Sequence, residues 1–285
     1  MAAIEVHMPF IRNLASSDRK IRTSALQSLR TFLSASATSS RLGPLETLKL
    51  WKGLYYSLWM CDRPIPQQNL CAELAALLDV LPDGAVGPWL AAFWETVGRE
   101  WTNIDALRLE KFLLLVRRVL GASLAWVCSA LPEAQEGGDD EENGNSNSKE
   151  TGDAENEKRR RRSRDRIDAL LENLASWPFE AEDNLSRVPV GPRLHVLDIW
   201  IDEVEKLGLL DANRTGEEGR QFLDRLGLLV EAQTRSKCKP VRLRAKETLA
   251  DDRLPWNADE AGDDELGKSV KKDSGDKDSW DGFDD

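Results

Sequence analysis

The sequence predicts an all-α protein, an irregular α-solenoid of HEAT-like helix pairs with a disordered acidic insertion and a disordered acidic C-terminal tail. Apolar residues recur at helical spacing through most of the 285 residues, and β-branched alternation is scarce. Proline and glycine separate the helical segments by short connections, which is typical of stacked helix pairs. No fixed-length repeat is visible, so the likeness to HEAT repeats concerns shape alone.

Composition divides the chain into four parts. We expect a helical array over 1–131, an acidic-then-basic insertion over 132–163, a second helical part of the same array over 164–250, and an acidic tail over 251–285. The net charge of −11 is uneven, because residues 1–132 hold 14 basic and 11 acidic side chains whereas 133–157 hold ten acids and one base. The tail holds 13 acids and five bases. Such segments bury too little apolar surface to offset the entropy lost on ordering.

The first two long helices precede residue 62. Ser17 is placed to cap a helix over 18–37. Its apolar stripe consists of Ile21, Ala25, Leu29 and Phe32. Pro44 then suits the first turn of a tryptophan-rich helix over 45–61. Five of its apolar residues share one face, which we expect to lie in the core: Trp51, Leu54, Tyr55, Leu58 and Trp59.

Three further helices are expected before the insertion. Pro66 opens a helix over 67–81 that ends at Pro82, Asp83 and Gly84. The face of this helix that we expect to be buried consists of Leu70, Leu74, Leu77 and Leu78. A shorter helix follows over 88–101. Asn103 then caps a long helix over 104–130.

Helices resume after the insertion, and we expect them over 164–175, over 192–207, after a capping box formed by Thr215 and Glu218, and over 240–250. The acidic tail is unusual in carrying Trp256, Trp280 and Phe283. Isolated aromatics among acids suit a short partner-docking motif, but a solvated tail has the same composition.

The cysteine pattern indicates a reducing compartment, and the lengths of the apolar runs indicate a protein without a membrane segment. Cys61, Cys71, Cys128 and Cys238 show no regular spacing and no histidine partners, which argues against disulfides and structural zinc. No apolar run of about 18 residues is present, and the first ten residues lack the core of a signal peptide. We expect a soluble intracellular protein with no membrane contact.

One helical face carries a possible metal site. His195, Asp198 and Asp202 fall at i, i+3 and i+7, and imidazole with carboxylates is a donor set that binds divalent ions. Because no ligand from another segment is evident, a polar outer face explains these residues better. The chain contains two histidines, no P-loop, no G-x-S-x-G and no dinucleotide-binding glycine turn. We therefore expect no enzyme, no cofactor and no small-molecule substrate.

Three basic groups are candidate contacts for RNA or for an acidic partner. On the helix over 104–130 they are Arg108, Lys111, Arg117 and Arg118, which serve equally well as surface ion-pair partners. Lys237, Lys239, Arg242 and Arg244 form a second cluster. The densest run contains seven basic residues in nine and is expected to direct nuclear import: Lys158, Arg159, Arg160, Arg161, Arg162, Arg164 and Arg166.

Several of these segments resemble one family. Residues 49–67, KLWKGLYYSLWMCDRPIPQ, are similar to the signature KLWKGLFY-x-x-W-x-SDKP-x-x-Q of the nucleolar ribosomal-RNA-processing protein one family. Residues 189–203 resemble its motif P-x-GLxxH-x-x-DI-x-x-DE, with Pro192 in place of the usual leucine. Residues 101–118 resemble a third motif, from which Ala106 and Glu110 depart. The opening over 10–22 also looks like the start of the family.

The resemblance implies a non-catalytic nucleolar assembly factor of the large ribosomal subunit, required for pre-rRNA processing. It further implies contacts with pre-rRNA, the precursor particle and other assembly factors, including Brix-domain proteins. Two alternatives remain. One is a nuclear adaptor or histone-binding protein that uses its acidic arms, and the other is a metal-dependent nuclease centred on His195, Asp198 and Asp202.

Overall fold

The computed structural model describes residues 10–14, 16, 18–35, 42–132, 146–211 and 214–257, and all regular elements of these residues are helices. The α-helices are α1 (Phe10–Leu14), α2 (Arg19–Ser34), α4 (Pro44–Trp59), α5 (Pro64–Ala75), α6 (Asp83–Glu100), α7 (Ala106–Cys128), α8 (Ser146–Ser176), α9 (Val190–Lys206), α10 (Glu217–Gln233) and α11 (Lys239–Leu249). Two 3-10 helices, Ala76–Val80 and Trp101–Asn103, follow α5 and α6. None of these helices is long and apolar enough to span a bilayer.

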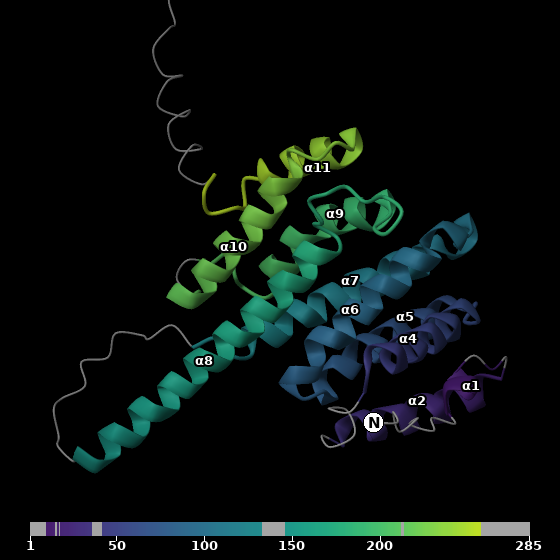
Figure 1. Ribbon diagram of the computed structural model, residues 1–285, viewed down its shortest axis with the longest axis horizontal. Helices are drawn as coiled ribbons and strands as arrows, with labels where there is room; N and C mark the ends of the chain where they lie inside the picture. The colour runs from purple at the N-terminus through teal and green to yellow at the C-terminus, as the bar shows by residue number, and fades with distance from the viewer. Residues whose placement is uncertain are drawn as a thin grey trace, which may run out of the picture.

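The helices stack in two layers in the order of the sequence (Figure 1). In one layer α4, α6, α8 and α10 pack successively against one another, and in the other α5, α7, α9 and α11 do the same. α1 and α2 pair with each other, and α1 packs against α4. Contacts between α4 and α5, α7 and α8, and α10 and α11 join the layers. The predicted all-α solenoid is confirmed.

Four of the five residues on the predicted apolar face of α4 are buried in the core, and Trp59 is half-buried against it. Trp51 is 1% exposed, and its indole N–H donates to the carbonyl of Trp89 in α6 at 2.9 Å. Tyr55 stacks on Phe112 of α7, with ring centroids 4.4 Å apart. α4 is thus held by side chains of both layers. On α2 the buried stripe differs from the predicted one, because Ile21 is 43% exposed and Leu26 and Leu33 are buried in its place.

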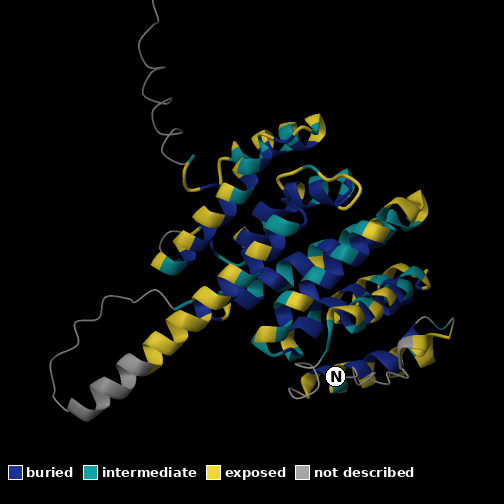
Figure 2. Ribbon diagram, in the orientation of Figure 1, coloured by how far each residue is buried: buried dark blue, intermediate teal, exposed yellow. Residues whose placement is uncertain are grey.

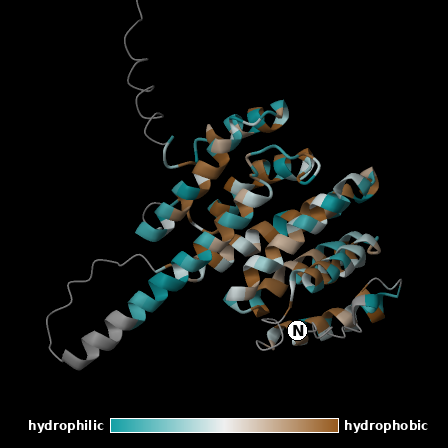
Figure 3. Cartoon of the chain, viewed as in Figure 1, coloured by the Kyte–Doolittle hydropathy of each residue, from teal (hydrophilic) through white to brown (hydrophobic). Residues whose placement is uncertain are grey.

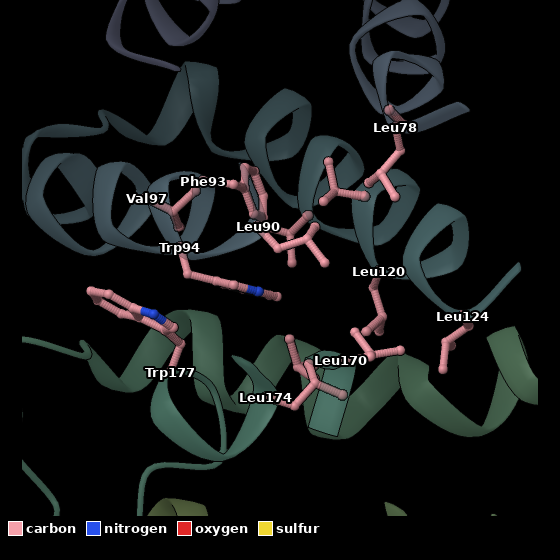
Figure 4. Close-up of a cluster of buried hydrophobic side chains, with 14 of the residues drawn as sticks. Leu78, Leu90, Phe93, Trp94, Val97, Leu120, Leu124, Leu170, Leu174 and Trp177 are labelled. Atoms are coloured by element: carbon pink, nitrogen blue, oxygen red, sulfur yellow. The ribbon is translucent and has the colours of Figure 1, made fainter. Parts of the chain in front are cut away.

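One half of α8 packs in the core, and the other half projects from the array (Figures 1 and 2). Leu170 and Leu174 face α6 and α7, where Trp94, Leu120 and Leu124 complete a buried apolar cluster (Figure 4). Toward its N-terminus the helix is hydrophilic in the part that projects from the array (Figure 3). One helix therefore joins the core to a charged surface.

Helix starts are where the structure departs most from expectation. Asp18 caps α2 by accepting from the Lys20 N–H at 2.7 Å, while Ser17 lies outside the described residues. α7 is capped by Asp105, which accepts from the Arg108 N–H at 3.0 Å, and not by Asn103. Asp18 and Asp105 are the cap residues because each places a carboxylate oxygen within hydrogen-bonding distance of a first-turn backbone N–H that has no acceptor within the helix.

Two predicted helix starts and one capping box are wrong. α5 begins at Pro64, before Pro66, and α6 runs through Pro88 from Asp83. A proline inside a helix costs one hydrogen bond, but burial of Trp89 and later residues holds α6 together. Thr215 does not cap α10, because its hydroxyl donates to the Gly208 carbonyl at 3.0 Å and Gly216 is the cap residue.

Ordered residues extend into both segments that the sequence predicts to be disordered. Residues 133–145 lie outside the described part, but α8 already begins at Ser146 and continues through the basic run. Extending an existing helix is inexpensive, and lysine, arginine and glutamate have good helix propensity. The tail beyond 250 is described to Asn257, whose side-chain amide donates to the Leu249 and Asp251 carbonyls. Trp280 and Phe283 lie outside the described residues.

Candidate nucleic-acid and partner interface

The four basic residues of α7 do not form one surface stripe. Lys111 is 4% exposed, and its ammonium group donates to the carbonyls of Trp59 and Cys61 at 2.8 and 2.9 Å. Burial lowers its pKa, with Asp62 opposing that change from 3.8 Å. Lys111 therefore donates hydrogen bonds to backbone carbonyls at the end of α4 that have no partner within the helix. It is not available to RNA.

Arg108 and Arg117 are engaged within the array. Arg108 pairs with Asp105 and lies over the Trp59 ring, 4.9 Å from its centroid. Arg117 pairs with Asp202 at 2.8 Å and with Glu203 at 2.6 Å, which ties α7 to α9. Burial works against its charge, but these bonds outweigh it and raise the pKa of Arg117.

Arg118 differs from its three neighbours. Its side chain is exposed, and it has no ion-pair partner among the described residues. Of the four candidates on α7, Arg118 is the one whose guanidinium is open to a phosphate or a carboxylate of another molecule.

The possible metal site on α9 is not assembled. Asp198 pairs with Arg244, and Asp202 bonds to Arg117 and Arg253. The His195 Nε2 lies 2.9 Å from the Leu113 carbonyl, and burial lowers its pKa. Among the described residues no group of three or more histidine, cysteine, aspartate or glutamate side chains is placed to hold a metal ion. The nuclease alternative loses its proposed centre, because arginines occupy both carboxylates.

The basic run on α8 is anchored at one end and exposed at the other. Arg166 is buried, and its guanidinium bonds to Asp83 of α6 at 2.7 Å and to the Trp126 carbonyl. Arg162 bonds to the second carboxylate oxygen of Asp83, also at 2.7 Å. Burial would raise the pKa of Asp83, but these two arginines lower it.

The remaining five cations of the run are exposed: Lys158, Arg159, Arg160, Arg161 and Arg164. Three of them have weak or local partners. Arg159 donates to the Leu131 carbonyl, Arg164 pairs with Glu157, and Arg160 lies 3.8 Å from Glu218. Exposed pairs of this kind contribute little stability and exchange readily with other anions. Residues 158–164 form the densest run of cations on a helix in the described part of the chain.

The second basic cluster is divided between structural and open positions. Arg242 donates to the Ser236 carbonyl at 2.6 Å, and Arg244 pairs with Asp198 and Glu247. Lys237 and Lys239 are exposed at the start of α11, with no ion pair to another described residue. These two lysines remain as candidate contacts.

Two anchoring groups are not evident from the sequence pattern. Asp83, which the sequence places in a helix break, holds α8 against α6. Arg193 is fully buried and bonds to Asp183, the Glu180 carbonyl and the Gln233 side chain. Arg193 lies within the motif over 189–203, but its hydrogen-bond partners come from other segments, which the spacing of residues in the sequence does not reveal.

Comparison with known proteins identifies the family. The family model described as nucleolar protein, Nop52, matches residues 5–282 of this chain. The chain belongs to the Nop52 family. The resemblance drawn from the sequence motifs is thereby confirmed, and with it a nucleolar family.

Relatives of this Nop52 protein carry the name ribosomal RNA processing protein 1 homolog. Homolog A of Mus musculus is 33% identical over 216 residues, which are 75% of this chain and 37% of that protein. Homolog B of Homo sapiens is 32% identical over 202 residues, 70% of this chain and 22% of that protein. The Drosophila melanogaster homolog is 32% identical over 123 residues, 42% of this chain and 18% of that protein. The chain thus spans well under half the length of these relatives.

Proposed function

We propose that this chain is a helical scaffold that acts without catalysis in nucleolar rRNA processing, during assembly of the large ribosomal subunit. In this proposal it binds pre-rRNA and other assembly factors, among them Brix-domain proteins, within the precursor particle. Membership of the Nop52 family and the names of its relatives support the role in rRNA processing.

The projecting half of α8 is the observation that carries the proposal. Its five exposed cations lie on successive turns of a helix whose other half is fixed in the core. A rigid helix that presents cations at a spacing of about 5–6 Å can follow a phosphate backbone without being ordered on binding. Arg118, Lys237 and Lys239 are the additional candidates for such contacts.

The same run supports a proposal for nuclear entry. Arg166 and Arg162 are committed to Asp83, so an import receptor would read the outer residues 158–161. Replacing Arg159, Arg160 and Arg161 with glutamine in a tagged full-length chain is expected to reduce nuclear accumulation. Undiminished accumulation would place the import signal elsewhere.

RNA binding tests the scaffold proposal directly. One variant replaces Lys158, Arg160 and Arg161 by glutamine, which keeps helix propensity. A control variant replaces Arg99 and Arg235 by glutamine, so that exposed charge is lost at other places on the surface. Affinity for a pre-rRNA fragment is measured by fluorescence anisotropy at several salt concentrations. We expect the slope of log K against log salt to fall by about 2–3, since each lost phosphate contact contributes about 0.7–0.9. The control variant should keep the slope of log K against log salt that the parent chain shows.

Association with particles completes this test. The triple variant should leave the large-subunit precursor fractions of a sedimentation gradient while its melting temperature stays unchanged. A folded triple variant that binds RNA with an unchanged salt slope and still co-sediments would contradict the role given to α8.

A further inference from the structure

An unfilled groove runs between α6 and α8 on the surface of their layer, with a volume of about 990 Å³. Its α6 wall consists of the small residues Gly84, Gly87, Pro88 and Ala91, at i, i+3, i+4 and i+7. A Cβ atom built on Gly84 would meet no atom within 4 Å. The two helices therefore leave space where neighbours in an array usually interdigitate.

A buried polar atom in this groove lacks a partner. Asn173 lines the α8 wall, is 9% exposed, and donates from Nδ2 to the Ala169 carbonyl at 2.9 Å. Its Oδ1 is buried and accepts no hydrogen bond from any described residue. A buried acceptor without a donor is unfavourable. Because Oδ1 is closed to solvent, the Asn173 side chain has to turn toward the groove before an N–H of an occupant can reach it. An indole combines one N–H donor with a large apolar body, which matches the small-residue wall.

Exposed cations line both ends of the groove. Lys158 and Arg161 line it at the outer end of α8, and Arg187 lines the other end, where it lies over the Trp177 ring. Asp165 and Glu172 lie between them on the α8 wall. An RNA backbone carries a negative charge at every nucleotide and would meet these carboxylates, whereas a peptide can place its acids at the cationic ends. The pattern favours an acidic peptide with an apolar, N–H-bearing side chain.

The chain itself contains such a peptide. Residues 278–285 read Asp-Ser-Trp-Asp-Gly-Phe-Asp-Asp, with four carboxylates and no base. We propose that residues 278–285 dock in the groove between α6 and α8, with the Trp280 indole donating to Asn173 and the acids facing Lys158 and Arg161. Phe283, three residues from Trp280, covers a further part of the small-residue wall.

The tail leaves the described part of the chain beside α10, the neighbour of α8 in its layer. Trp256 lies against Gly227 of α10, where a Cβ would approach its ring to 2.8 Å. Arg225 of α10 pairs with Asp168 of α8 at 2.7 Å, and Asp168 adjoins the groove residue Ala169. From Asn257 to Trp280 there are 22 intervening residues, which can span up to roughly 75 Å. Neighbouring helices lie about 10 Å apart, so the reach is sufficient, and the tether raises the effective concentration into the millimolar range, roughly.

Photo-crosslinking in the full-length chain tests the proposal. Benzoylphenylalanine replaces Phe283, which leaves Trp280 in place, and crosslinked peptides are mapped by mass spectrometry. We expect crosslinks within one chain to residues 84–91 or 169–177. Gly84→Leu places a leucine side chain in the open space of the groove, and leucine has good helix propensity. The substitution should therefore abolish these crosslinks while the protein stays folded. Ala72→Leu adds the same side chain to an exposed position of α5 and should leave them unchanged.

The role of Asn173 is tested in the same assay. Asn173→Ala removes the acceptor and should lower the crosslink yield about three- to tenfold. Mixing isotopically heavy and light chains distinguishes crosslinks within a chain from crosslinks between chains. Crosslinks outside the groove, crosslinks that survive Gly84→Leu, or crosslinks between chains would each overturn the proposal. Added RNA that crosslinks to the small-residue wall over 84–91, away from Lys158 and Arg161, would overturn it in favour of a nucleic-acid site.

Discussion

Asp83 and Arg166, 83 residues apart in sequence, bind each other through a 2.7 Å hydrogen bond that joins the start of α6 to the middle of α8. The same guanidinium lies over the Trp126 ring, 4.9 Å from its centroid, and donates to Ser129. Arg166 is therefore a buried cation held by one carboxylate and several neutral acceptors. The parts of the array before and after residues 133–145 meet at this point.

Asp83→Asn is expected to lower the free energy of unfolding by about 2–4 kcal/mol, because it leaves the Arg166 guanidinium buried without its counter-ion. Urea denaturation followed by circular dichroism measures the loss. Asp79→Asn is the matched control, since Asp79 is exposed four residues earlier and should change stability by less than about 0.5 kcal/mol. Equal effects of the two substitutions would contradict the anchoring role of Asp83.

Stability should fall in acid, and Asp83 should account for part of the fall. Its carboxyl pKa is depressed in the folded protein, so the stabilisation is complete above the unfolded pKa of about 3.9 and is lost as the pH falls through the lower folded value. Asp202 and Asp251 carry depressed pKa values for similar reasons. Urea midpoints between pH 7 and pH 2 should show a shallower acid loss for Asp83→Asn than for the parent chain.

Trp51→Ala is expected to cost about 3–5 kcal/mol of unfolding free energy, because it opens a large cavity beside Trp89 and Phe93. Trp51→Phe keeps most of the volume and should cost less, with loss of the hydrogen bond to the Trp89 carbonyl as one component. Leu107→Ala serves as the control, since Leu107 is 94% exposed. Thermal and urea unfolding should rank the three variants in that order of severity.

Lys111 and Arg118 should behave oppositely although they lie on one helix. Lys111→Met should destabilise the protein by about 1–3 kcal/mol, because the Trp59 carbonyl loses its side-chain donor and the Cys61 carbonyl keeps only the bond from the Gln67 amide. Arg118→Met should leave stability within about 0.5 kcal/mol and weaken association with RNA or precursor particles. Unfolding curves and gradient sedimentation on both variants separate these outcomes. A folded Lys111→Met protein with a specific binding defect would restore Lys111 to the interface.

If residues 278–285 cover Lys158 and Arg161, tail and RNA compete for the same cations. Trp280→Ala combined with Phe283→Ala is then expected to raise RNA affinity about two- to tenfold at low salt, because the tethered competitor is weakened. Fluorescence anisotropy of the full-length chain measures the change. The substitutions leave every charge in place, so an unchanged affinity would mean that the tail does not shield α8.

Local patterns predicted the helices better than their ends or their polar contacts. The face that contains Trp51 and Leu58 follows from spacing within one helix, and the structure buries it. The choice of Asp105 over Asn103 as a cap depends on which side chain meets the Arg108 N–H, a difference of two residues that composition does not determine. Lys111 was expected at the surface because lysine is rarely buried unless paired. Its acceptors are the carbonyls of Trp59, at the end of α4, and of Cys61, just after it, 52 and 50 positions away in sequence. No local pattern reveals them.

The arrangement of α8 over α6 and α7 has a consequence for synthesis. Trp94, Leu120 and Leu124 emerge from the ribosome before Leu170 and Leu174, which later cover them (Figure 4). At about 5–20 residues per second this apolar face stays open for roughly 2–10 s in the nascent chain. Each residue inserted between α7 and α8 lengthens that interval, while the loop-closure cost in the finished fold grows only with the logarithm of length. Chaperone demand and aggregation during translation, more than the stability of the completed array, should therefore limit how long this connection can become.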